Sequence, residues 1–178
     1  MKKGDCFLVK GKEINEPMTV YYVTDIDENY IWAKSFSVDT TMISALPIED
    51  KYNNDIPPNI IPLPSDSWEW GKKEMLSFLK EINAYLIDNV IKEKTEIITG
   101  CHYYNNCDIY TITEIGEERI RYNLIKLDED FISPYWTGDT SRDNAEMWYP
   151  ISEEMYSEVV SRYNRLLSRL RKKFWGYK

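Results

Sequence analysis

Apolar and polar side chains alternate along two stretches of the chain. Between Phe7 and Trp32 the sequence is FLVKGKEINEPMTVYYVTDIDENYIW, and between Glu96 and Arg121 it is EIITGCHYYNNCDIYTITEIGEERIR. Alternation with a period of two is typical of β-strands that bury one face. Each stretch therefore predicts a small antiparallel meander.

Polar turns divide each stretch into three strands. The predicted strands are Cys6–Lys10, Thr19–Ile26 and Tyr30–Val38 in the first stretch, and Thr95–Thr99, Asp108–Ile115 and Arg119–Leu127 in the second. A glycine, Gly11 or Gly100, ends each first strand, because glycine tolerates a positive φ. Acidic turns at Asp27–Asn29 and Gly116–Glu118 reverse the chain before each third strand.

The two stretches match each other without a gap when one is shifted by 89 residues. The identical pairs are Gly11/Gly100, Tyr21/Tyr110, Thr24/Thr113, Ile26/Ile115, Glu28/Glu117 and Ile31/Ile120. The conservative pairs are Leu8/Ile97, Val9/Ile98, Val20/Ile109, Val23/Ile112 and Asp25/Glu114. These are the apolar and turn positions that a β unit needs, so we interpret the match as a tandem duplication.

The third strand of each meander changes the face that carries its apolar residues. Ile120, Tyr122 and Leu124 alternate, and the apolar positions then move to Ile125 and Leu127. Because strand side chains alternate with a period of two, such a jump indicates a bulge or a sharp bend. Short, strongly bent meanders close small barrels. The predicted unit is therefore an SH3-like or Tudor-like barrel.

An irregular segment and an amphipathic helix follow each meander. Leu46–Ser67 contains five prolines, which exclude a helix and a central strand, and Ser133–Pro150 is the corresponding second loop. Ser152 is the expected N-cap of the second helix. The helical apolar stripes are Met75, Phe78, Leu79, Ile82, Tyr85, Leu86 and Val90, and then Val159, Val160, Tyr163, Leu166, Leu167, Leu170 and Phe174.

These elements predict an α+β fold made of two repeats, residues 1–92 and 93–178. Each repeat is a bent β meander, or barrel, followed by one amphipathic helix, and Trp68 and Trp148 precede the helices at related positions. A unit of about 85 residues buries only about 60–65% of its unfolded surface. We therefore expect the two halves to pack together as one compact body.

The composition fits a folded, reduced protein. Of the 178 residues, 43% are hydrophobic and 14% are aromatic, which is enough for a core. Three cysteines give no disulfide framework. The start, MKKGDC, leads into no apolar signal segment, and no stretch approaches the length of a membrane span. These features predict a cytoplasmic location.

The charge is acidic overall and basic at the C-terminal end. A net charge of −8 makes nucleic acid an unlikely partner, because phosphate backbones are repelled. From Ser152 to Lys178, however, seven lysines and arginines face three acids. These cations can offset the helix dipole and pair with the acidic body of the chain. Alternatively, they bind a membrane surface, nucleic acid or an acidic protein.

The segment GCHYYNNCD gathers the residue types that bind zinc. Cys101, His102, Cys107 and Asp108 lie within eight residues, in a predicted loop. The spacing matches no standard zinc pattern, and the corresponding loop Lys12–Thr19 lacks these ligands. Cys101, His102 and Cys107 are therefore the candidate metal ligands, with an ordinary polar loop as the competing interpretation.

No catalytic residue or cofactor is assigned from the sequence. His102 is the single histidine, so any nucleophilic pair would have to use it, and Cys101 beside it is poorly placed. Most carboxylates fall in predicted tight turns, where they bond the local backbone. No glycine-rich phosphate loop is present.

Aromatic side chains gather in the two segments predicted to be irregular. The candidate partner-binding residues are Trp68, Trp70, Tyr135, Trp136, Trp148 and Tyr149. Exposed rings beside a small barrel form grooves for proline-rich or extended peptides. The alternative is that these rings cover the barrel ends and the seam between barrel and helix.

The favoured function is a non-enzymatic protein-interaction module, such as a small inhibitor, immunity or adaptor protein that binds a basic protein. The segments KKGDCFLVK and YYVTDIDENYIWAKSF are similar in style to small-barrel bacterial immunity proteins, without a motif that assigns a family. Acidic surfaces speed association with basic partners. The alternatives are a metal protein or enzyme centred on Cys101, His102 and Cys107, and a nucleic-acid or reader module. The sequence leaves the oligomeric state open.

Overall fold

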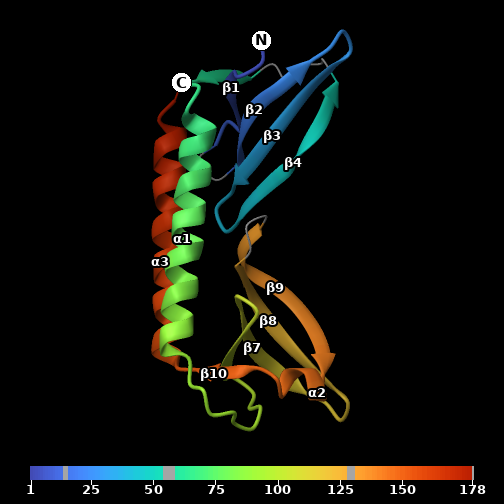
Figure 1. Ribbon diagram of the computed structural model, residues 1–178, viewed down its shortest axis with the longest axis vertical. Helices are drawn as coiled ribbons and strands as arrows, with labels where there is room; N and C mark the ends of the chain where they lie inside the picture. The colour runs from blue at the N-terminus through green and yellow to red at the C-terminus, as the bar shows by residue number, and fades with distance from the viewer. Residues whose placement is uncertain (14–15, 54–58, 128–130, 178) are drawn as a thin grey trace. The chain divides into compact units, whose positions relative to one another are not determined.

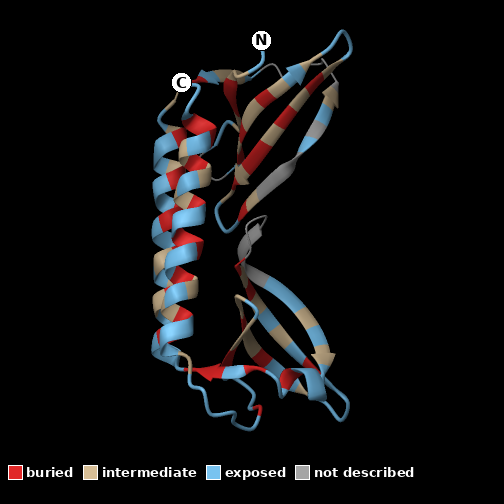
Figure 2. Cartoon of the chain, in the orientation of Figure 1, coloured by how far each residue is buried: buried red, intermediate tan, exposed pale blue. Residues whose placement is uncertain are grey.

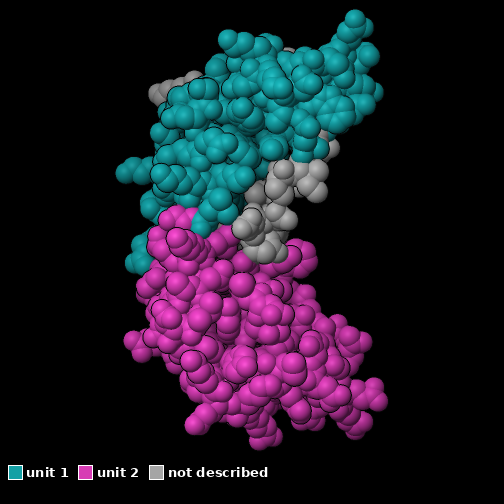
Figure 3. Space-filling view, in the orientation of Figure 1, with its two compact units in different colours: residues 1–76, 165–178 teal, residues 77–164 magenta. Residues whose placement is uncertain are grey.

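The structure, a computed structural model, is an α+β fold with two antiparallel sheets and a long C-terminal helix (Figure 1). It describes residues 1–13, 16–53, 59–127 and 131–177. The chain divides into two compact units (Figure 3). Unit 1 contains residues 1–76 and 165–178, and unit 2 contains residues 77–164. The predicted fold class is therefore confirmed at the level of α+β with antiparallel sheets.

The sheet of unit 1 has the strand order β5-β1-β2-β3-β4. Its strands are β1 (Cys6–Lys10), β2 (Met18–Ile26), β3 (Tyr30–Val38), β4 (Ile43–Asn53) and β5 (Ile60–Leu63). Asp27 holds the predicted turn between β2 and β3, because its carboxylate accepts hydrogen bonds from the backbone N–H groups of Asn29 and Tyr30, each at 2.8 Å. These bonds, the Asn29 bond foremost, lower the pKa of Asp27.

The sheet of unit 2 has the corresponding order β10-β6-β7-β8-β9. Its strands are β6 (His102–Asn105), β7 (Asp108–Ile115), β8 (Arg119–Leu127), β9 (Phe131–Ser141) and β10 (Tyr149–Ile151). A short helix, α2 (Arg142–Ala145), connects β9 to β10. Ser141 caps α2 by accepting a hydrogen bond from the backbone N–H of Asn144 at 3.3 Å.

The two sheets share a register that repeats at the offset of 89 residues. Val23 pairs with Ala33, and Ile112 pairs with Tyr122. The register then shifts between Val23 and Asp25 in β2 and between Ile112 and Glu114 in β7. A bulge thus interrupts the two central hairpins at matching positions.

The first strands match at a different offset. The N–H of Gly4 donates to the carbonyl of Val23, and the N–H of Gly100 donates to that of Ile112, both at 2.8 Å. Gly4 and Gly100 have similar positive φ values, 88° and 85°. The offset here is 96 residues, so the chain between Gly100 and Ile112 is seven residues shorter than the chain between Gly4 and Val23. The predicted strand Thr95–Thr99 is therefore wrong, and β6 lies in the predicted loop.

Both segments predicted to be irregular contain strands, which is a second correction. Leu46–Ser67 includes the end of β4 and all of β5, and Ser133–Pro150 includes most of β9, α2 and the start of β10. Along β4, the register with β3 moves from Leu46 to Asp50 and skips Pro47. Along β9, the register with β8 moves from Trp136 to Ser133 and skips Pro134. These prolines lie at bulges, where the ladder requires no N–H donor.

The predicted bend in each third strand is confirmed, whereas closure into a barrel is not. The register shifts between Ala33 and Ser35 in β3 and between Leu124 and Lys126 in β8. Within each unit, the described strands form an open sheet whose first and last strands do not pair with each other. No closed SH3-like or Tudor-like barrel is found among the described residues.

Two long helices contribute to both units. Helix α1 spans Ser67–Asn89, and α3 spans Glu153–Trp175. Residues 67–76 and 165–175 belong to unit 1, and residues 77–89 and 153–164 belong to unit 2. The backbone N–H of Met155 donates to Ser152 Oγ at 3.1 Å, so the predicted N-cap is confirmed. Trp68 lies inside α1 rather than before it.

Most residues of the predicted apolar stripes are buried (Figure 2). The buried stripe residues are Met75, Phe78, Leu79, Ile82 and Leu86 of α1, and Val159, Tyr163, Leu166, Leu167, Leu170 and Phe174 of α3. In unit 1, Phe174 packs on Phe36 with ring centroids 5.6 Å apart. Gly71 lets α1 approach the same ring, because a Cβ atom there would overlap Phe36. In unit 2, Phe78 packs edge-on against Tyr163.

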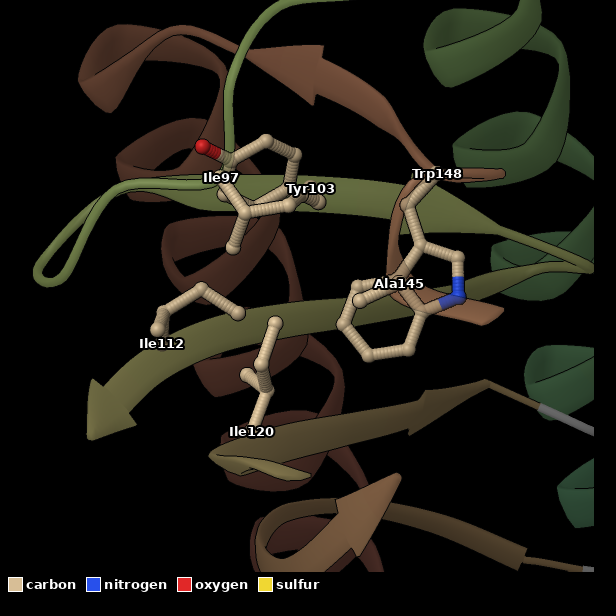
Figure 4. Packing of buried hydrophobic residues seen from close by; sticks show 6 residues of the cluster. All are labelled: Ile97, Tyr103, Ile112, Ile120, Ala145 and Trp148. Carbon is tan, nitrogen blue, oxygen red and sulfur yellow. The ribbon is translucent and has the colours of Figure 1, made fainter. Parts of the chain in front are cut away.

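Each sheet also buries side chains on its second face. In unit 1 this cluster is formed by Phe7, Val23 and Ile31. The cluster of unit 2 is larger and consists of Ile97, Tyr103, Ile112, Ile120, Ala145 and Trp148 (Figure 4). Ala145 and Trp148 come from the segment around α2, which covers this face.

In the described part of the chain, no helix combines the length and apolar character needed to cross a bilayer.

Candidate functional site

His102 is a buried residue of unit 2 that contacts both β7 and α3. It lies in β6 opposite Thr111 of β7, and its Nδ1 is 2.8 Å from Thr111 Oγ1. Its Nε2 is 2.7 Å from Glu153 Oε2 at the start of α3. The ring also stacks on Tyr156, with centroids 3.9 Å apart and an interplanar angle of 3°. The His102 side chain is 8% exposed, whereas that of Glu153 is 77% exposed.

The hydrogen bonds of His102 define its neutral tautomer. The Glu153 carboxylate only accepts hydrogen bonds, so the proton must lie on Nε2. In the neutral ring Nδ1 then accepts from the Thr111 hydroxyl. The order hydroxyl, imidazole, carboxylate is that of a nucleophilic triad. Here the ring is covered by Tyr156, and the partners of His102 come from β7 and α3, so these contacts connect β6, β7 and α3.

The candidate metal ligands share one hairpin without converging. Cys101 is exposed before β6, and Cys107 is half-buried in the turn that follows β6. Asn106 and Cys107 have positive φ values of 48° and 69°. Among the described residues, no three His, Cys, Asp or Glu side chains are grouped so that they could hold a metal ion. To bind one, His102 would have to give up a bond to Thr111 or Glu153, so the metal site stays a prediction.

The candidate partner-binding rings lie mostly within regular elements, contrary to the prediction. Trp68 and Trp70 are in α1, Tyr135 and Trp136 are in β9, and Tyr149 is in β10. Trp68 and Trp148 are only 5% and 2% exposed, so they are core residues. The side chain of Tyr135 lies outside the described residues.

Trp148 is packed into an aromatic cluster with two tyrosines. It stacks on Tyr110 at 3.9 Å and meets Tyr122 edge-on at 5.5 Å, while Tyr110 and Tyr122 are 5.0 Å apart. Because the rings fill the space between one another, they do not form a cage for a cation. Burial, assisted by the charge of Asp108, raises the pKa of Tyr110 to about 12.

Of the five candidate rings whose side chains the structure describes, two are exposed, and both belong to unit 2. Trp136 is 46% exposed, and Tyr149 is 37% exposed with Lys94 Nζ 5.8 Å from its ring centroid. Trp70 of unit 1 is half-buried against Phe174, with Lys173 Nζ 5.4 Å from its ring centroid. The exposed rings of the described structure therefore favour a binding surface on unit 2.

Unit 2 also carries all of the excess negative charge. It has eight lysines and arginines against seventeen aspartates and glutamates, whereas unit 1 has fourteen against thirteen. The β7–β8 turn adjoins α2, because the backbone N–H of Arg142 donates to the carbonyl of Glu118 at 3.2 Å. This contact brings together four exposed acids, which we call the acidic end: Glu117, Glu118, Asp143 and Glu146.

Positive charge follows one face of the C-terminal half of α3. We call the exposed residues Arg165, Arg169, Lys172 and Lys173 the basic stripe. Arg169 reaches Glu74 of α1 at 3.1 Å, although its side chain remains 61% exposed. Part of the predicted pairing with the acidic body of the chain is thus present within unit 1.

Sequence reasoning missed the acidic end and the role of His102. The acids of the acidic end are separated by about 25 residues of sequence, and the contact between the turn and α2 brings them together. The signal that was available was the strong excess of acids between residues 77 and 164.

Comparison with family models, with curated proteins and with solved structures finds no match to this chain.

Proposed function

We propose that this chain is a non-enzymatic, cytoplasmic protein-interaction module of the inhibitor, immunity or adaptor kind. Unit 2 provides the binding surface, and the partner is a basic protein. The observation that carries the proposal is the charge of unit 2, with seventeen acids against eight bases and four of those acids gathered at the acidic end. A field of one sign steers an oppositely charged partner and raises its association rate.

Exposed rings supply the short-range part of the same proposal. Charge pairs at the rim of an interface set the association rate more than the affinity, whereas buried aromatic side chains slow dissociation. Trp136 and Tyr149 are large, partly exposed rings in the acidic unit. They are therefore the residues that we assign to direct partner contact.

The proposal includes a duplicated origin for the two halves, residues 1–92 and 93–178. It is supported by the common strand order and by the bulges at Val23–Asp25 and Ile112–Glu114, which match at 89 residues. The chain from Gly100 to Ile112 is seven residues shorter than the chain from Gly4 to Val23, and this difference accounts for the change of offset.

The test is capture of the partner from host lysate by the immobilised chain at physiological salt. Wild type is compared with Glu117→Gln/Glu146→Gln, which removes two charges from the acidic end. The control, Glu13→Gln/Glu16→Gln, removes two exposed charges from unit 1. We expect a basic protein to bind wild type and control alike and to bind the acidic-end variant at least several-fold more slowly.

A second variant distinguishes direct contact through Trp136 from electrostatic steering by the acidic residues. Trp136→Ala is expected to raise the dissociation rate of the captured partner with little change in association. A captured protein that is not basic, or one that binds all variants equally, would contradict the proposal.

A further inference from the structure

We propose that unit 1 binds a small phosphate-bearing anion beside the first turns of α1, through Lys34, Lys72 and the indole N–H of Trp68. This site lies outside unit 2, so it does not depend on the partner-binding surface proposed above. Three features meet there: a buried hydrogen-bond donor without an acceptor, two half-buried lysines without a carboxylate partner among the described residues, and the N-terminal end of a long helix.

The indole N–H of Trp68 is a donor that the described chain leaves unsatisfied. Trp68 is 5% exposed, and its Nε1 has no hydrogen-bond partner among the described residues. Buried polar groups nearly always have a partner, so this one indicates an acceptor from outside the chain. Trp148 Nε1 also lacks a described acceptor, but Trp148 has tyrosine rings beside it, whereas Trp68 has a lysine. Trp68 is therefore the indole that suits an anionic acceptor.

Lys34 lies on the face of the unit 1 sheet that α1 covers. Phe36, two residues further along β3, meets α1 at Gly71, where a Cβ atom would overlap the Phe36 ring. The pairing of β3 with β2 runs without interruption from Phe36 opposite Val20 to Lys34 opposite Tyr22. Because strand side chains alternate between the two faces, Lys34 and Phe36 point to the same face, towards α1.

A series of contacts leads from Lys34 to Lys72. Tyr22 is directly opposite Lys34, which places their Cβ atoms about 4.5–5.5 Å apart. The ring centroids of Tyr22 and Trp68 are 5.6 Å apart. The Nζ of Lys72 is 5.1 Å from the centroid of the Trp68 ring. Because lysine has a long and flexible side chain, both ammonium groups reach the space beside the indole.

Neither Lys34 nor Lys72 has a carboxylate partner in the described parts of the chain. Both side chains are half-buried, so a bound anion is less screened by solvent than it would be at fully exposed lysines. Glu49, at the β4 bulge beside Lys34, accepts a hydrogen bond from the Thr24 hydroxyl. Both ammonium groups are therefore available to an anion.

The other acids of this region gather around Cys6 of β1. Burial, and then the charges of Asp66, Asp5 and Glu69, raise the pKa of the Cys6 thiol. β1 pairs with the edge of β2 that faces away from β3. These acids therefore lie towards β1, whereas Lys34 is on β3.

A phosphate group matches the donors of the site. A phosphomonoester carries a charge of about −1.5 to −2 at pH 7 and offers three acceptor oxygens. One oxygen accepts from the Trp68 N–H, and the others accept from the two lysine ammonium groups. Trp68 and Lys72 also belong to the first two turns of α1, a helix of 23 residues, where the helix dipole favours negative charge. Since Lys72 lies over the indole on a flexible stem, rotation of this side chain opens the N–H to the anion.

The experiment is nitrogen–proton correlation NMR of the full chain, in which each of the six tryptophans gives one indole N–H signal. Trp68→Phe lacks the signal of Trp68 and so assigns it. The probes are inorganic phosphate and methyl phosphate at about pH 7, with sodium chloride of equal ionic strength as the control. We expect both phosphates to move the Trp68 signal downfield to saturation, because the N–H gains an acceptor, and chloride to leave it in place.

Three variants test the charges. Lys34→Gln/Lys72→Gln is expected to weaken phosphate binding at least about tenfold, because two charge-assisted hydrogen bonds are lost. The control Lys12→Gln/Lys73→Gln removes the same charge from exposed positions of unit 1 and is expected to bind as wild type does. Glu49→Gln removes the carboxylate beside Lys34 and is expected to tighten binding about two- to fivefold, the range of exposed charge pairs. Unfolding cannot produce such a gain.

Unchanged positions of the other indole signals show that each variant is folded. The inference is overturned if phosphate leaves the Trp68 signal in place, if chloride moves it equally, or if Lys34→Gln/Lys72→Gln binds as tightly as its control. It is also overturned if Glu49→Gln binds no more tightly than wild type. Tighter binding of methyl phosphate than of inorganic phosphate assigns the site to a phosphate group on a small molecule, and the reverse order assigns it to free phosphate.

Discussion

An imidazole is buried at low cost only when both ring nitrogens have partners, and His102 meets that condition. Thr111 and Glu153 satisfy the two nitrogens, and Tyr156 covers the ring. The single histidine of the chain therefore has a structural explanation that requires no reaction and no metal. The same contacts make it a sensitive position for stability.

His102→Ala is expected to lower the free energy of unfolding by about 2–4 kcal/mol, because it leaves a cavity and removes two hydrogen bonds. Urea denaturation followed by circular dichroism measures the change. Glu153→Gln is the control, because the glutamine side chain keeps an oxygen that can accept the hydrogen bond from His102 Nε2 at an exposed position. It is expected to lower the free energy of unfolding by less than about 1 kcal/mol. If His102→Ala lowered the free energy of unfolding as little as the control does, the contacts of His102 would not stabilise unit 2.

Cys107 occupies a backbone conformation that suits glycine. Its φ of 69° follows Asn106 at 48°, and a two-residue hairpin turn with both φ values positive favours the sequence Asn-Gly. Cys107→Gly is therefore expected to raise the free energy of unfolding by up to about 1 kcal/mol, while Cys107→Ala should give no gain. Thermal melts of the three proteins provide the comparison, and equal melting temperatures for the glycine and alanine variants would contradict the expectation.

At the scale of elements, three tyrosines lie buried or partly buried on the second face of the unit 2 sheet. Burial raises the pKa of Tyr103, Tyr110 and Tyr122, and that of Tyr110 reaches about 12. The unfolded chain ionises its tyrosines near pH 10. Since the folded state holds these protons more tightly, their contribution to stability is fully present below pH 10.

Stability is therefore expected to fall as the pH rises from 10 towards 12, because the unfolded state releases its phenol protons first. Urea midpoints measured at intervals across this range test the prediction. Tyr110→Phe has no phenol to ionise and should flatten the decline, whereas Tyr149→Phe changes an exposed ring and should not. A decline of equal slope in all three proteins would point to other groups.

Strand positions were predictable from the sequence wherever local alternation and turn residues agreed. The limits of β1, β3, β7 and β8 match their predicted limits, because each is bounded by a polar or acidic turn. β6 was not predictable, since an ungapped comparison cannot detect that the segment from Gly100 to Ile112 is seven residues shorter than the segment from Gly4 to Val23. β4 and β9 were missed because prolines argued against strands, whereas Pro47 and Pro134 fall at bulges.

The candidate site was less predictable than the fold for a related reason. Local sequence identifies rings and acids, but burial depends on which elements meet. Trp148 is buried because α2 covers the second face of the sheet, and Glu118 adjoins α2 through a long-range backbone bond. By contrast, His102 was identified as chemically notable, although its partners Thr111 and Glu153 come from elements that only folding brings together.

At the scale of the whole molecule, the two helices connect the units covalently. Unit 1 needs residues 165–178, whose Phe174 packs on Phe36 and Trp70. A cut between residues 92 and 93 separates residues 165–178 from the rest of unit 1, and it leaves the second fragment without any part of α1, including residues 77–89 of unit 2. The sequence repeat and the compact units therefore divide the chain differently.

We expect fragments 1–92 and 93–178 to be largely unfolded when separate and to recover structure when mixed, because each lacks part of the helical cover that its sheet needs. Circular dichroism of the separate and mixed fragments tests this. Cooperative thermal unfolding of fragment 1–92 alone would show that the first repeat needs no residue of α3.

The discontinuous composition of unit 1 affects the order in which the chain matures on the ribosome. All residues of unit 2 lie between 77 and 164, so this later half is complete as soon as residue 164 leaves the exit tunnel. The sheet of unit 1 emerges first but must wait for residues 165–178, which follow unit 2 in the sequence and are added at about 5–20 residues per second. During that interval the nascent sheet exposes Phe36 without its aromatic cover, and this is the stage at which chaperones have the most to bind.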